Sequence, residues 1–127
     1  MVVEVPQMVD TSKDVLAYLR VADAAQGPDH YVGVFQALGS IYFQYRTGGA
    51  ESSAEIPYSA TDHRWWRIRD VGGMIHWDTS PDGVTWMNRR MLASPIALTR
   101  VMVDLSAENP SLAAPGAAHF DDFNSAP

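Results

Sequence analysis

The sequence predicts an all-β protein, an antiparallel β-sandwich of two packed sheets, and three observations support this prediction. Apolar residues alternate with period two far more often than with the 3.6-residue period of a helix. The alternating runs are short, and Gly, Pro, Asp and Ser separate them. The chain has 127 residues, is 46% hydrophobic and supplies four Trp, five Tyr and four Phe, which suits a single core. We therefore expect one domain over 1–127, with 1–9 and 124–127 peripheral.

Ten short strands in a chain of this length indicate two packed sheets. The segment Asp10–Leu19 has weak helical character, but Val15 and Tyr18 continue the alternation and favour a strand. The segment Asn109–Ala118 is rich in Pro, Ala and Gly and is expected to be a long loop. The expected strands are Val2–Val5, Val15–Ala22, Tyr31–Gln36, Ser40–Arg46, Glu51–Ile56, Arg64–Asp70, Met74–Thr79, Val84–Met91, Ala97–Leu105 and Ala117–Phe123.

The stretch HRWWRIRDVGGMIHWDTSPDGVTWMNRRML is the most informative, because Gly72-Gly73 and Asp82-Gly83 are typical centres of two-residue hairpin turns. Three antiparallel strands follow from them. The first turn pairs Val71 with Met74, Arg69 with His76, Ile68 with Trp77 and Arg67 with Asp78. The second turn would pair Thr79 with Trp86 and Asp78 with Met87. Within the second turn, Asp82 is expected to bond to local backbone, Gly83 to accept a positive φ, and Trp86 to anchor the hairpin in the core.

This pairing sorts the side chains of the three strands into two faces. The core face receives Trp66, Ile68, Ile75, Trp77, Val84 and Trp86. The polar face receives Trp65, Arg67, Arg69, His76, Asp78, Met87 and Arg89, with Arg67 and Asp78 as a cross-strand ion pair.

An aromatic ring beside guanidinium groups and a carboxylate suits a sugar, whose ring stacks and whose hydroxyls hydrogen-bond. The candidate ligand-binding residues are therefore Trp65, which would stack, together with Arg67, Arg69, His76, Asp78 and Arg89. Two alternatives stay open. Mixed charges are also what solvation of an outer sheet face requires, and a loop such as Ile56–Asp62 could cover Trp65.

The charge balance argues against nucleic acid and anionic lipid as partners. The formal net charge is −6 and the pI is near 4.9, although six of the nine basic residues fall between Arg64 and Arg100. There is no cysteine, so no disulfide or thiolate metal site is expected. The start, MVVEVPQMVD, lacks the pattern of a signal peptide, and no run of about 18 apolar residues could insert into a membrane.

No catalytic or metal-binding constellation stands out in the sequence. The four histidines have no partner at a ligand spacing, so zinc is not expected. Asp121-Asp122 could offer oxygen ligands to calcium, but neighbouring strand residues point to opposite faces, and we expect no cofactor. Glu4, Glu51, Glu55 and Glu108 are isolated, whereas glycoside hydrolysis needs two facing carboxyl groups. We expect that the protein is not an enzyme.

The block HRWWRIRD, the Gly-Gly turn, IHWDTSPDGVTW and the closing HFDDFN resemble the concanavalin A-like lectin and glucanase-type jelly-roll modules of actinobacterial and actinobacteriophage proteins, including minor tail and other virion proteins. The resemblance spans nearly the whole chain. It implies a non-catalytic jelly roll that attaches to glycans or cell surfaces, or a virion building block, and it carries over no set of binding residues. Such modules usually have further strands before the position of Val2–Val5, so this sandwich would be abbreviated at its N-terminus.

We therefore expect a structural or attachment module, in a virion or at a cell surface, that binds a glycan or a partner protein through a sandwich face. The alternatives are a purely architectural capsid or tail decoration protein and an accessory carbohydrate-binding module of a glycosidase. An unpaired edge beside Ala117–Phe123 would favour strand addition by a neighbouring chain, and hence a homo-oligomer or larger assembly.

Overall fold

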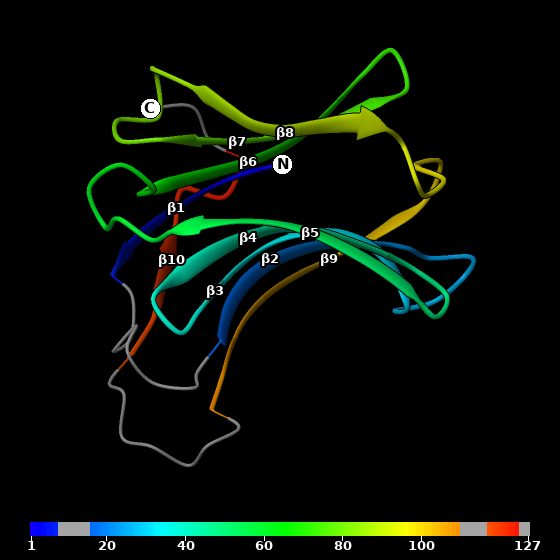
Figure 1. The fold of residues 1–127 in the computed structure, drawn as a ribbon, viewed down its shortest axis with the longest axis horizontal. Coiled ribbons are helices and arrows are strands. Elements are labelled where there is room, and N and C mark those ends of the chain that lie inside the picture. The colour runs from blue at the N-terminus through cyan, green and yellow to red at the C-terminus, as the bar shows by residue number, and fades with distance from the viewer. Residues whose placement is uncertain (8–15, 110–116, 125–127) are drawn as a thin grey trace.

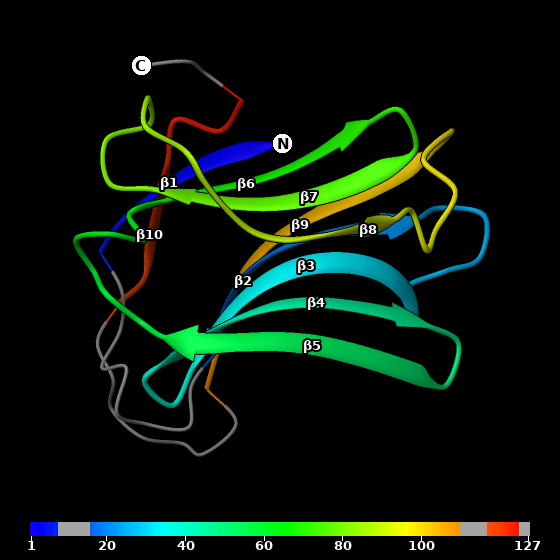
Figure 2. The same ribbon diagram turned by 45° about the horizontal axis from the view of Figure 1, so that its top comes forward.

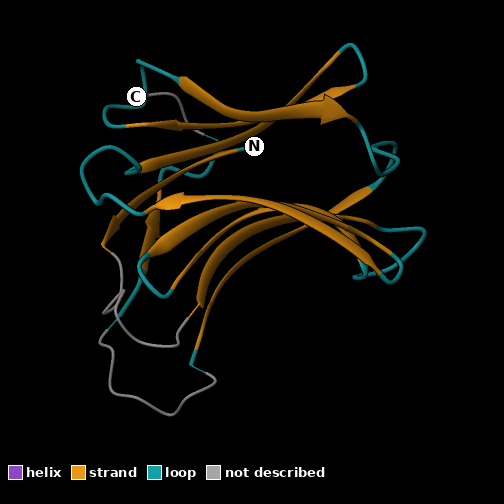
Figure 3. Cartoon of the chain, in the orientation of Figure 1, coloured by secondary structure: helices purple, strands orange, loops and turns teal. Residues whose placement is uncertain are grey.

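The computed structural model describes residues 1–7, 16–109 and 117–124, and these form strands and loops without a helix (Figure 3). Two antiparallel sheets of five strands pack as the two layers of a β-sandwich, as predicted (Figures 1 and 2). The strands are β1 (Val2–Gln7), β2 (Leu16–Asp23), β3 (His30–Ala37), β4 (Ser40–Thr47), β5 (Ala50–Pro57), β6 (Trp65–Val71), β7 (Met74–Ser80), β8 (Met87–Ala93), β9 (Val101–Glu108) and β10 (His119–Asp121).

The first sheet has the order β10-β1-β6-β7-β8 and the second β5-β4-β3-β2-β9. The expectation that 1–9 is peripheral is wrong for the described part of that segment. Strand β1 lies inside its sheet, between β10 and β6, and the side chains of Val3 and Val5 are buried in the core. The backbone of Val2 is also bonded to Asn124, which follows β10. The chain thus pairs its own first and last described strands.

The core forms where the inward residues of the two sheets meet, as the alternation predicts. Its largest fully buried side chains are Trp66 and Trp77 from one sheet and Phe43 from the other. Each indole N–H has a backbone acceptor: Trp66 Nε1 donates to the carbonyl of His63 at 2.8 Å, and Trp77 Nε1 donates to the carbonyl of Gly33 at 3.0 Å. The second bond crosses from one sheet to the other.

The Gly72-Gly73 hairpin has the predicted register, including Arg67 opposite Asp78 and Ile68 opposite Trp77. Both glycines have positive φ, at 60° and 81°, which a two-residue turn of this kind requires. Most of the other strands match the expected ones within a few residues. The predictions made for residues 8–15, 110–116 and 125–127, which include most of the Asp10–Leu19 and Asn109–Ala118 segments, fall outside the described part of the chain.

The prediction of a two-residue turn at Asp82-Gly83 is wrong. A longer loop, 81–86, joins β7 to β8, and Thr79 pairs with Met87 instead of Trp86. Val84, expected in the core, is 72% exposed, and Trp86 is only half-buried and lies outside the core cluster. Side-chain hydrogen bonds stabilise the longer loop over the two-residue turn, and the Asp-Gly dipeptide alone does not predict them.

Asp82 organises this loop. Its carboxylate accepts from the backbone N–H groups of Val84 at 2.9 Å and Thr85 at 2.7 Å, and from the hydroxyl of Ser80 at 2.9 Å. The hydrogen bonds from Thr85 and Val84 hold the pKa of Asp82 far below its usual range. Gly83 has a φ of 75°, so its predicted role and that of Asp82 in bonding local backbone are confirmed.

The register of β7 with β8 shifts between Trp77 and Asp78, which leaves Arg89 as an extra residue. This bulge turns Arg90 inward, between the sheets, opposite Trp77. Its guanidinium donates to the carbonyls of Phe43 at 2.6 Å and Ser52 at 2.9 Å in the other sheet, and to the hydroxyl of Ser52 at 2.7 Å. It also lies 5.2 Å from the ring of Tyr45. Arg90 therefore links the two layers at their β8–β5 side.

We expect Arg90→Met to destabilise the fold by about 2 kcal/mol, because charge-assisted bonds to two half-buried carbonyls are lost while the stem volume is kept. Urea unfolding followed by circular dichroism measures this. Arg100→Met, which changes an exposed arginine, is the matched control. Equal stability of the two variants would contradict a structural role for Arg90.

Candidate functional site

Four of the six candidate ligand-binding residues do lie together, on the outer face of β6 and β7. Asp78 is at their centre. Its Oδ2 accepts from Arg67 Nε at 3.0 Å and from Arg69 Nε at 2.7 Å, and its Oδ1 accepts from Asn88 Nδ2 at 2.8 Å. His76 Nδ1 lies 3.2 Å from Arg69 Nη2.

Asp78 is a buried charge that the neighbouring cations stabilise. Only 1% of its side chain is exposed, although it lies on the outer face. Burial by itself would raise the pKa of Asp78, but the hydrogen bonds from Arg69, Asn88 and Arg67 outweigh it and lower that pKa below the ordinary value. The carboxylate is therefore ionised and has three side-chain donors of its own.

The aromatic partner of this cluster is Trp86, not Trp65. The guanidinium of Arg67 lies 3.9 Å from the centroid of the Trp86 ring, a close cation–π contact. The 81–86 loop brings this ring over the outer face of the sheet, where the predicted hairpin would have turned it inward. A planar cation is thus held between an anion and an aromatic face.

Two candidates need correction. Trp65 is only 4% exposed, so its ring has no open face on which a sugar could stack. Arg89 does not join the Asp78 cluster, because the bulge displaces it: its Nε donates to Thr79 Oγ1 at 2.9 Å, and it lines a separate pocket with Asp62 and Trp86. The remaining four residues bond mainly to one another, so this face offers few unused polar groups.

A better-shaped surface lies on the outer face of the other sheet. Figure 1 shows that sheet arching toward its partner, so its outer surface is the hollow side. A groove of about 470 Å³ crosses β3, β4 and β5 there. Three aromatic side chains contribute to it, with apolar neighbours at one end and polar groups along the side. The lining residues are Tyr31, Phe35, Tyr42, Leu16, Ala37, Leu38, Gln44, Glu51 and Ser53.

Gly33 leaves the space in this groove that the ring of Phe35 occupies. A Cβ at position 33 would lie 3.0 Å from Cζ of Phe35 and 3.2 Å from the carbonyl oxygen of Leu19. The ring of Phe35 occupies the space that a side chain would take. It is packed between Tyr18 and Tyr31, with ring centroids 5.3 and 5.7 Å away.

Arg20 holds the other side of this aromatic cluster. Its guanidinium lies 5.4 Å from the ring centroid of Tyr18 and 5.5 Å from that of Tyr31, and it forms an ion pair with Asp104 on β9. The hydroxyl of Tyr18 donates to Glu108 at 2.8 Å. The aromatic rings of the groove are thus held by neighbours on both sides.

The groove residues were not among the candidates, although the sequence carries a signal for them. In Ser40–Arg46 both alternating sets of residues contain aromatic side chains, so aromatic residues of one set had to face outward. That Tyr31, Phe35 and Tyr42 meet across two strands depends on the β3–β4 register, which pairs Phe35 with Tyr42.

Within residues 1–7, 16–109 and 117–124, no group of three or more His, Asp or Glu side chains is placed to hold a metal ion. The same residues contain no helix of the length and apolarity needed to cross a bilayer.

We expect Asp78→Asn to destabilise the fold by roughly 2–3 kcal/mol at pH 7, because two half-buried arginines lose their anion. Folding lowers the pKa of Asp78, so its contribution is complete above about pH 4, the usual aspartate value, and is lost as the pH falls through the lower folded-state pKa. Urea midpoints at pH 7, 4 and 2.5 should therefore fall less steeply for the variant than for the wild type. Asp70→Asn, at an exposed site on the same strand, is the control. Parallel pH profiles for wild type and Asp78→Asn would contradict this role.

A scan against protein-family models, a search of curated proteins and a search of solved structures each returned no match to this chain. What is known of its architecture comes from its own residues: an all-β fold of two antiparallel five-stranded sheets.

Proposed function

We propose that this protein is a non-catalytic attachment module that binds a glycan in the groove on the outer face of the β5-β4-β3-β2-β9 sheet. The observation that carries the proposal is the combination of three aromatic side chains with an amide, a carboxylate and a hydroxyl in one hollow of about 470 Å³. Phe35 and Tyr42, which are half-buried, can stack on sugar rings, whereas Tyr31 is buried and supports them; the polar groups can bond the sugar hydroxyls. This site replaces the polar face of β6 and β7 as the expected binding surface.

The charges around the groove favour a neutral glycan. Glu51 is the one ionisable carboxylate among its lining residues, and no Lys or Arg lines it in the described part of the chain. The nearby Arg20 is already paired with Asp104. With a net charge of −6, the protein would repel sialylated or phosphorylated glycans.

We also propose that the sandwich is a jelly roll and that the protein acts in a virion or at a cell surface. Both parts of the proposal are supported by the resemblance of the hairpin residues to concanavalin A-like modules. The non-catalytic character has separate support. Hydrolysis of a glycosidic bond needs two carboxyl groups about 5 to 10 Å apart across the substrate, whereas this groove presents Glu51 alone among the described residues.

A glycan array with neutral and acidic oligosaccharides, followed by calorimetry on the best ligand, tests the proposal. We expect binding to neutral glycans and at least about a tenfold loss of affinity in Tyr42→Ala, because one stacking face is removed. Gln44→Ala should weaken binding with little effect on the fold. The matched control is Met91→Ala, at a 54% exposed position on the opposite sheet, which should bind as the wild type does.

Two results would overturn the proposal. One is the absence of any glycan binding on the array. The other is a ligand whose affinity is the same in folded Tyr42→Ala and in the wild type, since that ligand would bind elsewhere.

An architectural role as a decoration protein is the second candidate, and one observation favours it. Met91, on the edge strand β8, is 54% exposed on the outer face of the β10-β1-β6-β7-β8 sheet, and Val71 on β6 is 51% exposed on the same face. An exposed apolar side chain on an edge strand suits contact with another copy. The opposite edge, β10, has three residues and offers little backbone for pairing.

Light scattering over a range of concentrations tests this second role. We expect any oligomer to form through β8. The Met91→Glu variant, which leaves β10 as it is in the wild type, should therefore be monomeric. A stable oligomer without glycan binding would favour the decoration role. A monomer at every concentration would exclude assembly by this chain alone.

A further inference from the structure

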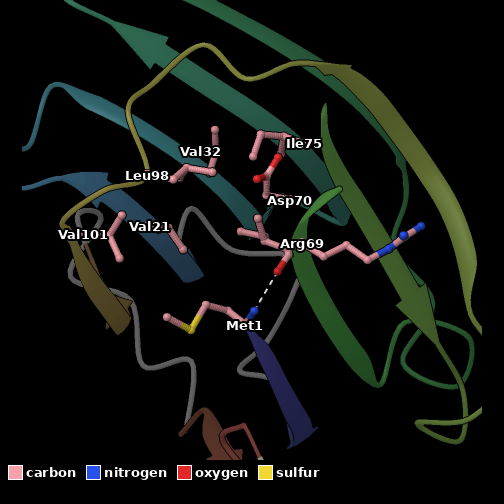
Figure 4. A pocket seen from close by; sticks show the side chains of 9 residues that line it. Met1, Val21, Val32, Arg69, Asp70, Ile75, Leu98 and Val101 are labelled. Atoms are coloured by element: carbon pink, nitrogen blue, oxygen red, sulfur yellow. Dashed lines mark hydrogen bonds between the residues drawn. The ribbon is translucent and has the colours of Figure 1, made fainter. Parts of the chain in front are cut away.

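A third pocket opens between the two sheets, at the end of the sandwich near the Gly72-Gly73 turn, and shares no lining residue with the groove. It has a volume of about 310 Å³. Figure 4 shows the side chains of Met1, Val21, Val32, Leu98 and Val101 around this space. Ile68 and Ile75 complete its apolar lining, and Arg69 and Asp70 contribute the remainder.

The base of the pocket is part of the hydrophobic core. Val21 and Val32 come from β2 and β3 in one sheet, and Ile68 and Ile75 come from β6 and β7 in the other; all four are almost fully buried. Leu98 and Val101, which are half-buried, lie nearer the opening. Because the pocket is open, its apolar side chains contact solvent, and a ligand that covers them would gain the hydrophobic free energy of the surface removed from water.

The charged groups near this pocket are either hydrogen-bonded to other residues or exposed to solvent. The guanidinium of Arg69 points away from it in Figure 4 and is bonded to Asp78 on the outer face. The ammonium of Met1 donates to the carbonyl of Ile68 at 2.7 Å, and Asp70 is exposed to solvent. The buried interior therefore offers apolar contact, and the carboxylate of Asp70, which lines the pocket and is exposed to solvent, is the charged group beside it.

From this geometry we propose that the pocket is a binding site for a small, neutral, apolar molecule of the size of one aromatic ring or a short alkyl chain. The volume sets the size, since an engineered cavity of about 150 Å³ in another protein holds benzene. The lining disfavours an anionic ligand, because a carboxylate would lose its hydration among apolar side chains and would lie near the carboxylate of Asp70. The site does not depend on the glycan proposal.

Methyl NMR with toluene as the probe tests the site on the intact protein. We expect saturable shifts at the methyl groups of Val21, Val32, Ile68, Ile75, Leu98 and Val101, and none at Leu16 or Leu38 in the groove. Sodium benzoate, which has the same ring with a carboxylate, should cause no such shifts at the same concentration. The wild type should also melt at a higher temperature in the presence of toluene.

The variant Val101→Phe places a ring in the opening and should weaken toluene binding by about tenfold or more. Val103→Phe is the matched control, because Val103 is the next inward residue of β9, is also half-buried and does not line the pocket. The absence of methyl shifts in the wild type at saturating toluene would overturn the proposal, even if neither variant folded. Shifts centred on other residues, or unchanged affinity in folded Val101→Phe, would do the same.

Discussion

The hydrogen bond from Trp77 to the carbonyl of Gly33 is the contact on which both layers of this fold depend. An indole N–H buried among apolar side chains is costly unless it has an acceptor, and here the acceptor belongs to the opposite sheet. The bond fixes where β7 lies over β3. On the other side of β3, the missing side chain of Gly33 gives Phe35 its place in the groove. One residue therefore links the position of the sheets to the shape of the outer surface.

The arginines of β6 and β8 show how a single bulge separates similar residues. Arg67 and Arg69 share the carboxylate of Asp78 on the outer face, whereas Arg90 enters the space between the sheets. Arg89 lies between these two environments and bonds to Thr79. Without the extra residue, Arg89 would lie opposite Trp77 and Arg90 would face outward. The bulge thus decides which of the two arginines contacts the other layer.

The sequence predicts the features that depend on local pattern. Period-two alternation gives the all-β class, most strand positions and the Gly72-Gly73 register, since each depends on neighbouring residues. The local pattern does not predict the 81–86 loop, because the carboxylate of Asp82 stabilises a turn longer than the Asp82-Gly83 dipeptide indicates. The bulge at Arg89 is a second departure from the predicted register, and it sets the positions of Arg89 and Arg90. The place of β1 between β10 and β6 depends on contacts between the two ends of the chain, which no local pattern encodes.

Gly33 is constrained on both sides of its sheet, and this has an evolutionary consequence. Its carbonyl is needed by an indole from the facing layer, and the space above its Cα is filled by the ring two residues further along. Trp77 needs only a backbone carbonyl at position 33, which any residue supplies, whereas the ring of Phe35 needs the missing Cβ. Distant relatives of this chain should therefore keep Gly33 and Phe35 together or replace both, while Trp77 varies independently of them.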